Sequence, residues 1–273
     1  MSTLYIVATP IGNLEDFSRR AERILREVSL IAAEDTRVTG KLLKYFNIST
    51  PQTSYYEHNK ASKLESVIAA LESGDVALVS DAGTPAINDP GYELVRAAID
   101  AGYEVSPIPG ASASIAALAV SGLPTDTFLY LGYLPRKKKD RREKLKEVEK
   151  LPYTLIFFET PHRLLKALGD IEEVLGNRQI TVAREMTKLY EEFFRGDVSA
   201  ARNFFEERNI RGEFVLVIDA FHQEDVLWTE ASLKDAIAAG IAEGIHPSKL
   251  AKSLAQESGW LRRDVYNRIS LIK

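Results

Sequence analysis

The sequence predicts an α/β protein made of two α/β domains followed by a C-terminal helical segment. Apolar, strand-like runs alternate with helical patterns through the first 130 residues. The composition then becomes strongly basic after Pro135, and a second alternating unit follows. The last 45 residues carry only helical periodicity. We therefore predict domains at 1–134, 135–222 and 223–273, with a basic linker over 135–150.

The first domain should contain a largely parallel sheet with helices on both faces. Val76–Val79 is an unbroken apolar run, as expected of a strand covered on both sides. Ala21, Ile24 and Leu25 share one face of a helix, and Ser73-Gly74 is typical of a helix end. The expected strands are 4–8, 30–33, 76–79, 103–108 and 128–131, and the expected helices are 18–26, 36–46, 60–71, 90–101 and 109–122.

The remaining elements follow from the same patterns. The second domain should have strands at 154–158, 179–183, 191–195 and 214–218, with helices at 161–175 and 200–208. Near the C-terminus, apolar helical spacing occurs on both sides of Ser258-Gly259. This pattern suits either a helix-turn-helix module or a small bundle that packs on the second domain.

Composition narrows the classes of function. The 273 residues are 45% hydrophobic and 27% charged, which provides apolar material for two cores. No apolar run approaches the roughly 18 residues of a membrane helix, and Met1 leads directly into a strand. We expect no membrane partner, no signal peptide and a cytoplasmic location. The absence of cysteine and the scattered histidines give no metal site, and the net charge of −4 restricts nucleic-acid binding to local patches.

Three loops share one character, because each follows a strand, is built from small residues and leads into a helix or turn. They are Thr9–Asn13, Ser80–Thr84 and Pro109–Ser114. Small residues let a ligand approach the backbone, and free N–H groups at a helix start can receive a carboxylate or phosphate. Each loop alone could be an ordinary connection. After parallel strands of one sheet, however, the three should meet at its carboxyl edge and form a ligand site.

Common motifs for other chemistries are absent or incomplete. The chain has no G-x-G-x-x-G, and Gly40-Lys41 lacks the rest of a phosphate-binding P-loop. Residues 110–114 approach a hydrolase nucleophile elbow around Ser112, but they end in Ser rather than Gly. No Asp and His partners are placed for Ser112, so a hydrolase is not supported.

Two polar clusters follow predicted strands and admit two interpretations. In Glu34–Arg37, Asp35 or Thr36 could cap the next helix or contact a substrate. In Glu159–Arg163, Pro161 suits a first helical turn, whereas the charged residues could stand at the edge of a cleft.

Two segments are locally basic. The run 136–146 holds eight Lys or Arg against two acidic residues, a net charge of +6, and residues 246–273 have a net charge of +4. Either segment could be a solvated helix face or could contact a phosphate backbone.

Seven sequence blocks carry a family resemblance. They are VATPIGNLEDFSRRA from Val7, AEDTRVT from Ala33, LVSDAGTPAINDPG from Leu78, PGASASIAALAVSGLPTDTFLYLGYLPRK from Pro109, FFETPHRL from Phe157, VAREMTKLYEE from Val182 and RGEFVLVI from Arg211. These blocks resemble the tetrapyrrole methylase superfamily, the class III S-adenosyl-L-methionine-dependent methyltransferases. The resemblance covers residues 4–220 and is closest to the ribosomal RNA branch, which methylates the ribose 2′-hydroxyl of a cytidine in the decoding region of 16S rRNA. The C-terminal segment resembles the accessory helix-turn-helix domain of some members.

The resemblance implies a methyl-donor cleft between the two α/β domains, a homodimer, and 16S rRNA or the 30S subunit as partner. Porphyrin-methylating relatives carry Gly-Asp-Pro where this chain has Ser80-Asp81-Ala82, and they have a glycine-rich first loop, which argues against a tetrapyrrole substrate here. By position, the residues implied to bind S-adenosyl-L-methionine are Pro10, Asp81, Ala82, Gly83, Thr84, Ile87, Ser112, Ala113, Met186 and Phe214.

A ribose hydroxyl is a poor nucleophile, so a nearby base or hydrogen-bond acceptor should assist methyl transfer. Asp35, Glu159 and Glu185 are the residues we consider for this catalytic role. Two rival interpretations are a methylase of a small molecule, which would not need the basic segments, and a non-catalytic nucleic-acid-binding module built on a methylase core.

Overall fold

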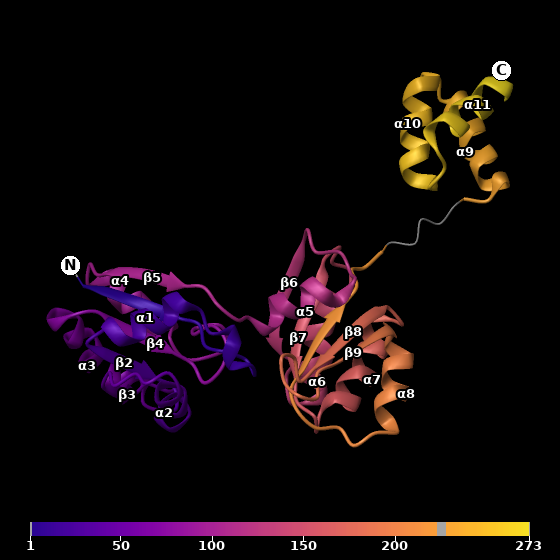
Figure 1. Ribbon diagram of the computed structural model, residues 1–273. Coiled ribbons are helices and arrows are strands. Elements are labelled where there is room, and N and C mark those ends of the chain that lie inside the picture. Colours follow the sequence, from indigo (N-terminus) through magenta and orange to yellow (C-terminus); the bar gives the residue numbers. More distant parts are fainter. Residues whose placement is uncertain (1, 223–227, 273) are drawn as a thin grey trace. The chain divides into compact units, whose positions relative to one another are not determined.

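The computed structural model describes residues 2–222 and 228–272, and it divides into two compact units, Met1–Ala220 and Phe221–Lys273 (Figure 1). The first unit contains two five-stranded sheets, and the second contains helices. Among the described residues, no helix is both long and apolar enough to cross a membrane.

The first sheet is fully parallel and has the strand order β3-β2-β4-β1-β5. Its central strands are apolar, and all four residues of β4 are buried. A strand buried on both faces needs apolar residues at successive positions, which explains the continuous run read from the sequence. The strands are β1 (Thr3–Val7), β2 (Leu30–Ala33), β3 (Gln52–Ser54), β4 (Val76–Val79) and β5 (Glu104–Ile108).

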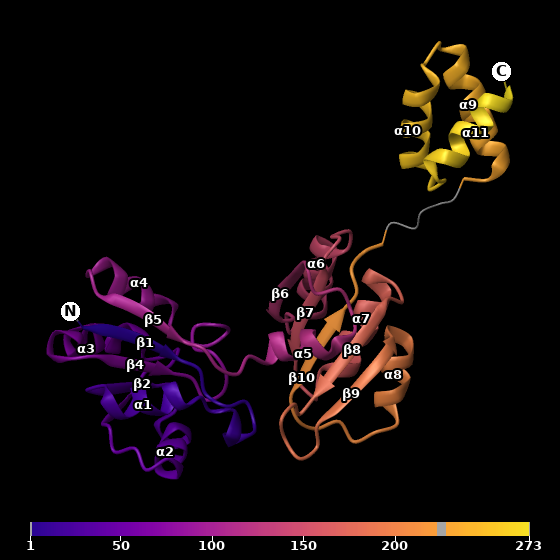
Figure 2. The same ribbon diagram turned by 45° about the horizontal axis from the view of Figure 1, so that its top comes forward.

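Helices cover both faces of this sheet (Figure 2). Ala77 and Val79 pack on one face in a cluster with residues of α1 (Arg19–Glu27) and α2 (Thr36–Tyr45). Leu78 points to the other face, where it packs with α3 (Lys60–Ser73) and α4 (Tyr92–Asp100). A short 3₁₀ helix, η1 (Leu14–Asp16), lies in the loop after β1. The predicted doubly covered α/β domain is therefore confirmed.

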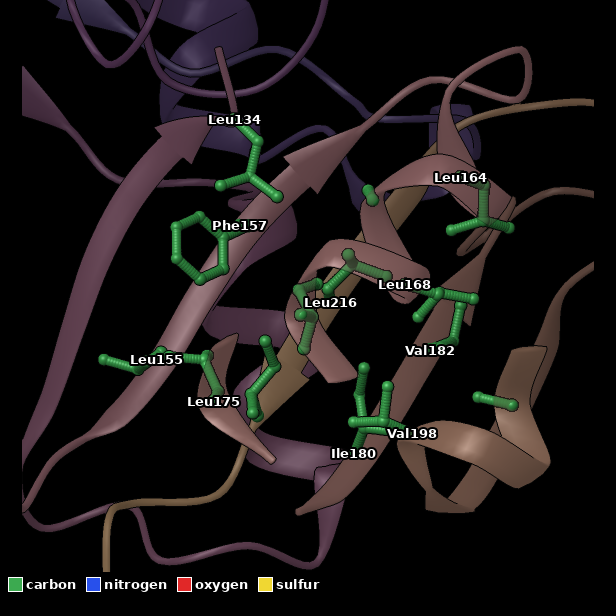
Figure 3. Close-up of a cluster of buried hydrophobic side chains, with 14 of the residues drawn as sticks. Leu134, Leu155, Phe157, Leu164, Leu168, Leu175, Ile180, Val182, Val198 and Leu216 are labelled. Carbon is green, nitrogen blue, oxygen red and sulfur yellow. The ribbon is translucent and has the colours of Figure 1, made fainter. Parts of the chain in front are cut away.

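The second sheet has the order β6-β7-β10-β8-β9, in which only β6 and β7 are parallel. One face packs on α6 (Lys138–Val148), α7 (Leu164–Leu175) and α8 (Val198–Glu206) around Phe157 and Leu216 (Figure 3). The opposite face packs on α5 (Ala113–Ser121). The strands are β6 (Phe128–Tyr133), β7 (Thr154–Glu159), β8 (Gln179–Arg184), β9 (Glu192–Asp197) and β10 (Phe214–Ile218).

One element belongs to a different sheet from the one the sequence suggested. Strand β6 was expected to continue the first sheet, but it pairs with β7, and α5 packs on the second sheet as well. The two sheets therefore divide between β5 and α5 rather than at residue 134. Periodicity identified these elements correctly, but it carries no information about which neighbouring strand supplies the hydrogen bonds.

The C-terminal unit forms its own apolar core from α9 (Glu230–Ala242), α10 (Pro247–Ser258) and α11 (Arg262–Ile272). Gly259 ends α10 in the left-handed conformation, and the indole N–H of Trp260 donates to the carbonyl of Trp228 at 2.7 Å. The predicted helix, Ser-Gly turn and helix are present, with a third helix packed against them.

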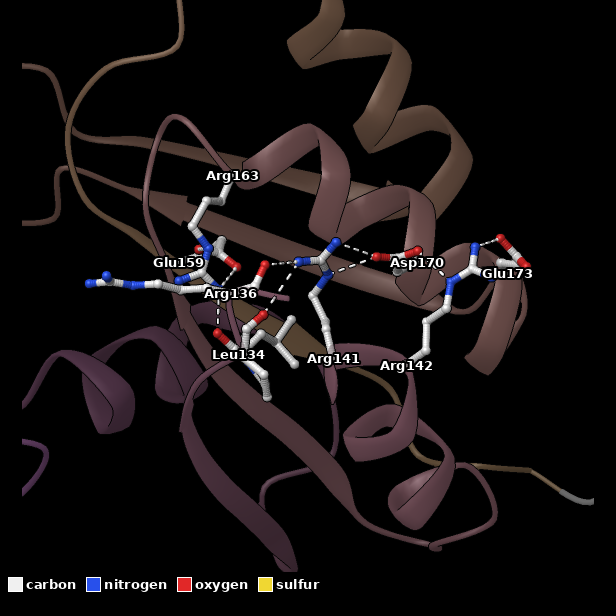
Figure 4. A network of polar contacts seen from close by, with 9 residues as sticks. Leu134, Arg136, Arg141, Arg142, Glu159, Arg163, Asp170 and Glu173 are labelled. Atoms are coloured by element: carbon white, nitrogen blue, oxygen red, sulfur yellow. Dashed lines mark hydrogen bonds and ion pairs between the residues drawn. The ribbon is translucent and has the colours of Figure 1, made fainter. Parts of the chain in front are cut away.

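The basic run contains an internal ion-pair network (Figure 4). Arg141 is buried and donates through Nε to Asp170 of α7 at 2.7 Å, and Arg142 donates to the other oxygen of the same carboxylate at 2.7 Å. Burial opposes ionisation of Asp170, but the guanidinium groups of Arg142 and Arg141 outweigh it and hold its pKa below the ordinary value. Part of the run therefore anchors α6 to α7.

We predict that Asp170→Asn lowers the free energy of unfolding by about 3 kcal/mol, because it leaves a buried guanidinium without its counter-charge. The side chain of Asp170 is only 5% exposed, so solvent gives little relief. Urea unfolding followed by circular dichroism measures the change. Glu173→Gln, which alters the exposed partner of Arg142, is the matched control and should change stability little. Equal effects of the two substitutions would contradict this account.

Candidate functional site

The three small-residue loops meet at the carboxyl edge of the first sheet, as predicted. Strands β4, β1 and β5 are neighbours, so the loops that follow them lie side by side. Thr9 and Gly83 exchange backbone hydrogen bonds of 2.8 and 3.0 Å. The hydroxyl of Thr84 donates to the carbonyl of Ala111 at 3.3 Å, which ties the second loop to the third. Side-chain and backbone bonds therefore hold the three loops as one assembly.

The backbone of this assembly needs small residues at defined places. Gly83 has a φ of +82°, a region that glycine enters without strain. A Cβ at Gly110 would lie 2.9 Å from the Cβ of Ala8, so only glycine allows the third loop to pass this close to β1. Ala86 and Asn88 also have positive φ values, of 66° and 63°, which is uncommon for residues with a side chain and frequent at functional sites.

A cavity of about 250 Å³ opens at this edge. It gathers most of the residues implied to bind a cofactor, together with aromatic side chains from the second sheet, Tyr133 and Phe158. The predicted residues that line it are Asp81, Ala82, Gly83, Thr84, Ile87, Ser112, Ala113 and Phe214. Pro10 instead lines a second, neighbouring cavity. Met186 is buried in the apolar cluster against which Ile11 and Ala113 pack, and is not among the lining residues.

Helix α5 begins at this cavity. Its N-cap residue, Ser112, makes no side-chain capping bond, and the first intrahelical hydrogen bond runs from the N–H of Ala116 to the carbonyl of Ser112. The N–H groups of the first turn therefore have no intrahelical acceptor. Because Ser112, Ala113 and Ser114 all line the cavity, this helix start can receive an anionic group such as a carboxylate.

The rest of the cavity wall is acidic. Its lining includes Glu34, Asp81, Asp89 and Glu213, and no basic side chain lines it among the residues that the structure describes. Burial raises the pKa of Glu34, although the backbone N–H of Asp81, 3.1 Å from its carboxylate, lowers it in part. Burial also raises the pKa of Asp81 and of Asp89. Burial is the largest cause of each raised value, and the carboxylates that line the cavity favour a ligand that carries positive charge.

A second cavity, of about 500 Å³, adjoins the first. Ile11, Asp81, Ala82 and Glu213 line both cavities and thus form a shared wall. The other walls come from the loop after β1, from one face of α2 and from Lys188. Its further lining residues are Thr9, Pro10, Gly12, Leu14, Val38, Thr39, Lys41, Leu42, Tyr45 and Ser80.

Asp35 has a structural partner. Its carboxylate accepts from the backbone N–H of Arg37 at 2.8 Å, caps α2 and binds the guanidinium of the same residue. These hydrogen bonds from Arg37 lower the pKa of Asp35 to about 2. The capping interpretation is therefore confirmed, and Asp35 is a weak base. Its catalytic role remains a prediction.

Glu159 and Glu185 are also engaged. Glu159 is 2% exposed, and this burial raises its pKa. Its carboxylate accepts from the N–H of Thr160 at 2.7 Å and pairs with Arg163 at 3.2 Å. Glu185 binds Lys188 and the N–H of Glu213, each at 3.0 Å. Burial opposes its ionisation, but these partners keep its pKa low. Neither residue is among those that line the two cavities, and their catalytic roles remain predictions.

Several lining residues were not singled out in the sequence. Glu34 begins the polar cluster that follows the second predicted strand, and Asp89 lies in the block from Leu78, but the sequence does not distinguish a carboxylate with a raised pKa from a surface one. Tyr133 ends β6 of the second sheet, and Glu213 directly precedes β10. Their approach to the first sheet depends on how the two sheets meet, which periodicity does not encode. The only usable signal was their position at or beside a strand end.

Comparison with known proteins assigns the family. The model of the tetrapyrrole (corrin/porphyrin) methylases matches residues 3–201. The chain belongs to this family. This methylase family member also resembles solved structures whose sequence identity to it is low, and these structures support its fold. A cobalt precorrin-4 methyltransferase, CbiF, has a TM-score of 0.61 at 15% identity and covers 80% of this chain and 94% of that one. The methyltransferase CobJ has a TM-score of 0.59 at 17% identity, covering 81% and 95%.

Closer relatives of this methylase family member extend over nearly its whole length. A Halalkalibacterium halodurans protein named Ribosomal RNA small subunit methyltransferase I is 49% identical and covers 97% of this chain and 93% of its own length. A protein of the same name from Bacillus subtilis is 44% identical, with 98% and 94% covered. One from Escherichia coli O157:H7 is 45% identical, with 94% and 96% covered. The similarity therefore includes the C-terminal unit.

We predict that the carboxyl groups at the first cavity titrate above their ordinary values. In carboxyl-carbon NMR spectra recorded against pH, Glu34 should have a pKa above 4.5, and Asp81 and Asp89 should have pKa values above 3.8. Asp35 serves as the internal contrast, because its pKa should be close to 2. Ordinary pKa values for Glu34, Asp81 and Asp89 would show that these carboxylates are not buried at the cavity as described above.

Proposed function

We propose that this family member transfers a methyl group from S-adenosyl-L-methionine to the ribose 2′-hydroxyl of a cytidine in 16S rRNA of the small ribosomal subunit. The observation that carries the proposal is the acidic cavity beside an uncapped helix start, with a second cavity across a shared wall. The full-length relatives named as small-subunit ribosomal RNA methyltransferases support RNA as the acceptor.

The first cavity fits the chemistry of this donor, which supplies an activated methyl group when bound. The donor's carboxylate suits the free N–H groups of Ser112–Ser114, and its positive charges suit the carboxylates of Glu34 and Asp89. Its adenine needs an apolar slot, which Phe158 and Phe214 provide. The positive φ values beside the cavity keep the backbone close to the ligand.

The shared wall positions the reaction. Methyl transfer is an in-line displacement, so the attacking oxygen must lie on the far side of the methyl group from the sulfur. Asp81 lines both cavities and has a raised pKa. We assign its carboxylate to hold the attacking hydroxyl by a hydrogen bond and to accept its proton, a contribution of about 10²–10⁴ in rate for a positioned base. This assignment adds Asp81 to the earlier candidates and gives it a role beyond donor binding.

Exposed cations supply contacts for the phosphate backbone. Arg136, Lys137, Lys138 and Lys139 are all exposed and begin three residues after Tyr133, which lines the donor cavity. Figure 4 shows the side chain of Arg136 extending away from the Arg141–Asp170 pair. The helical unit adds the exposed Lys249, Lys252, Arg262 and Arg263. Such contacts position an RNA without reading its sequence.

The rival substrate is a tetrapyrrole, as in the structural neighbours. The departures in the first and second loops argue against it, and a small substrate would not need the exposed basic run or the C-terminal unit. We further infer a cytoplasmic homodimer that acts on 16S rRNA or the 30S subunit, in keeping with the ribosomal RNA branch.

The test measures transfer of tritiated methyl from S-adenosyl-L-methionine to small subunits and to free 16S rRNA, with the product nucleoside identified after digestion. We predict a 2′-O-methylcytidine. Asp81→Asn should lower the rate about a hundredfold or more while RNA binding is retained, because the carboxylate charge is lost at constant shape. Asp100→Asn, at the exposed end of α4, is the matched control. Unchanged methylation by Asp81→Asn would contradict the role of the shared wall, and no transfer by the wild type to either RNA would contradict the function.

A further inference from the structure

One face of α2 lines the second cavity. Val38, Lys41, Leu42 and Tyr45 follow helical i, i+3, i+4, i+7 spacing, and all four line the second cavity. The opposite face of the helix packs into the core through Leu43. Tyr45 is 63% exposed, and its ring meets Phe46 edge-on with the ring centroids 4.9 Å apart. Helix α2 therefore presents the exposed Val38, Lys41 and Tyr45 to this cavity, while Leu42 lines the cavity and also packs against the core.

A buried hydroxyl faces the same space. Thr39 is 3% exposed and lines the second cavity, and its Oγ1 has no hydrogen-bond partner among the residues that the structure describes. A buried polar group without a partner is unfavourable unless a ligand or water completes it. This orphan hydroxyl indicates a polar occupant in contact with α2.

The charge of the second cavity differs from that of the first. Lys41 is exposed, whereas the ammonium of Lys188 is already paired with Glu185 at 3.0 Å and with Glu213 at 2.8 Å. Among the described residues, no basic side chain lines the first cavity. Asp81 and Glu213 lie in the wall that the two cavities share. Negative charge is therefore favoured on the α2 side, away from the shared wall, and a hydroxyl-bearing group is favoured next to it.

We propose that the second cavity is the acceptor subsite, which takes one unpaired nucleotide of the RNA with its base stacked on Tyr45 and its phosphate on Lys41. This inference rests on the proposed function and names the site of its substrate. An aromatic ring that is exposed beside a cation is the usual means of holding a splayed base, since every base has a face that can stack. The ribose then lies between Thr39 and the wall that contains Asp81. The donor cavity is on the other side of this wall.

The experiment uses the full-length chain and measures kcat/KM for small subunits, kcat/KM for free 16S rRNA, and calorimetric affinity for S-adenosyl-L-methionine. Tyr45→Ala should lower kcat/KM for RNA roughly ten- to hundredfold, and Tyr45→Phe, which keeps the ring, should restore it. Tyr92→Ala removes a tyrosine of similar exposure, 61%, that lines neither cavity, and should have no effect. Both substitutions are at exposed positions, so folding should be preserved.

Lys41→Gln tests the phosphate contact. It should weaken RNA binding and reduce the slope of log K against log salt by about one, whereas Lys44→Gln on the same helix, at an exposed position outside the cavity, should leave the slope unchanged. Donor affinity should be the same in all variants.

Three outcomes overturn the inference. Wild-type kinetics for Tyr45→Ala and Lys41→Gln, in an enzyme that methylates RNA, would place the acceptor elsewhere and leave the proposed function intact. Loss of donor affinity in Tyr45→Ala would show that the second cavity holds part of the donor. Equal effects of Lys41→Gln and Lys44→Gln would show that Lys41 acts on RNA binding only through the general surface charge, and not through a phosphate contact in the cavity. Failure of the wild type to methylate any RNA would instead contradict the proposed function.

Discussion

The pairing of three loops at the carboxyl edge of the first sheet is the constraint on which the site depends. Parallel order places the ends of β4, β1 and β5 side by side, and the two hydrogen bonds between Thr9 and Gly83 hold the first two loops together. Without this bridge, the shared wall of Ile11, Asp81 and Ala82 would not divide the edge into two cavities. The covered sheet therefore serves function by fixing backbone positions to which two ligands can bind.

Charge separates the two cavities. The first cavity, proposed for the donor, concentrates carboxylates whose pKa values are raised mainly by burial. The second cavity, proposed for the acceptor, has the exposed Lys41 of α2 and, from the loop between β8 and β9, Lys188, which is paired with Glu185 and Glu213. Arg141 and Arg142 have a structural role instead, because both guanidinium groups are paired with Asp170 within the fold. Only the cations that remain exposed, such as Arg136, are available to a phosphate backbone.

Much of the fold follows from the sequence, because strand burial and helix periodicity leave direct patterns. The bounds of β2, β4 and β10 match the predicted strands at both ends. The assignment of β6 to the second sheet could not be predicted, since partner choice depends on tertiary packing. For the site, the small-residue loops and the resemblance predicted a ligand site at Asp81–Thr84 and Ser112, and these residues line one cavity. The polar cluster Glu34–Arg37 was noted after its strand, but the burial that raises the pKa of Glu34 and of Asp89, and that isolates the hydroxyl of Thr39, depends on tertiary packing.

A crystal structure of the full-length chain with S-adenosylhomocysteine tests the central claim most directly. The account predicts the ligand in the first cavity, with its carboxylate at the start of α5, its adenine between Phe158 and Phe214, and its sulfur facing the wall that contains Asp81. The second cavity should remain free of the ligand. A ligand bound along α2 against Tyr45, or one whose sulfur points away from Asp81, would contradict the division of the edge into donor and acceptor cavities.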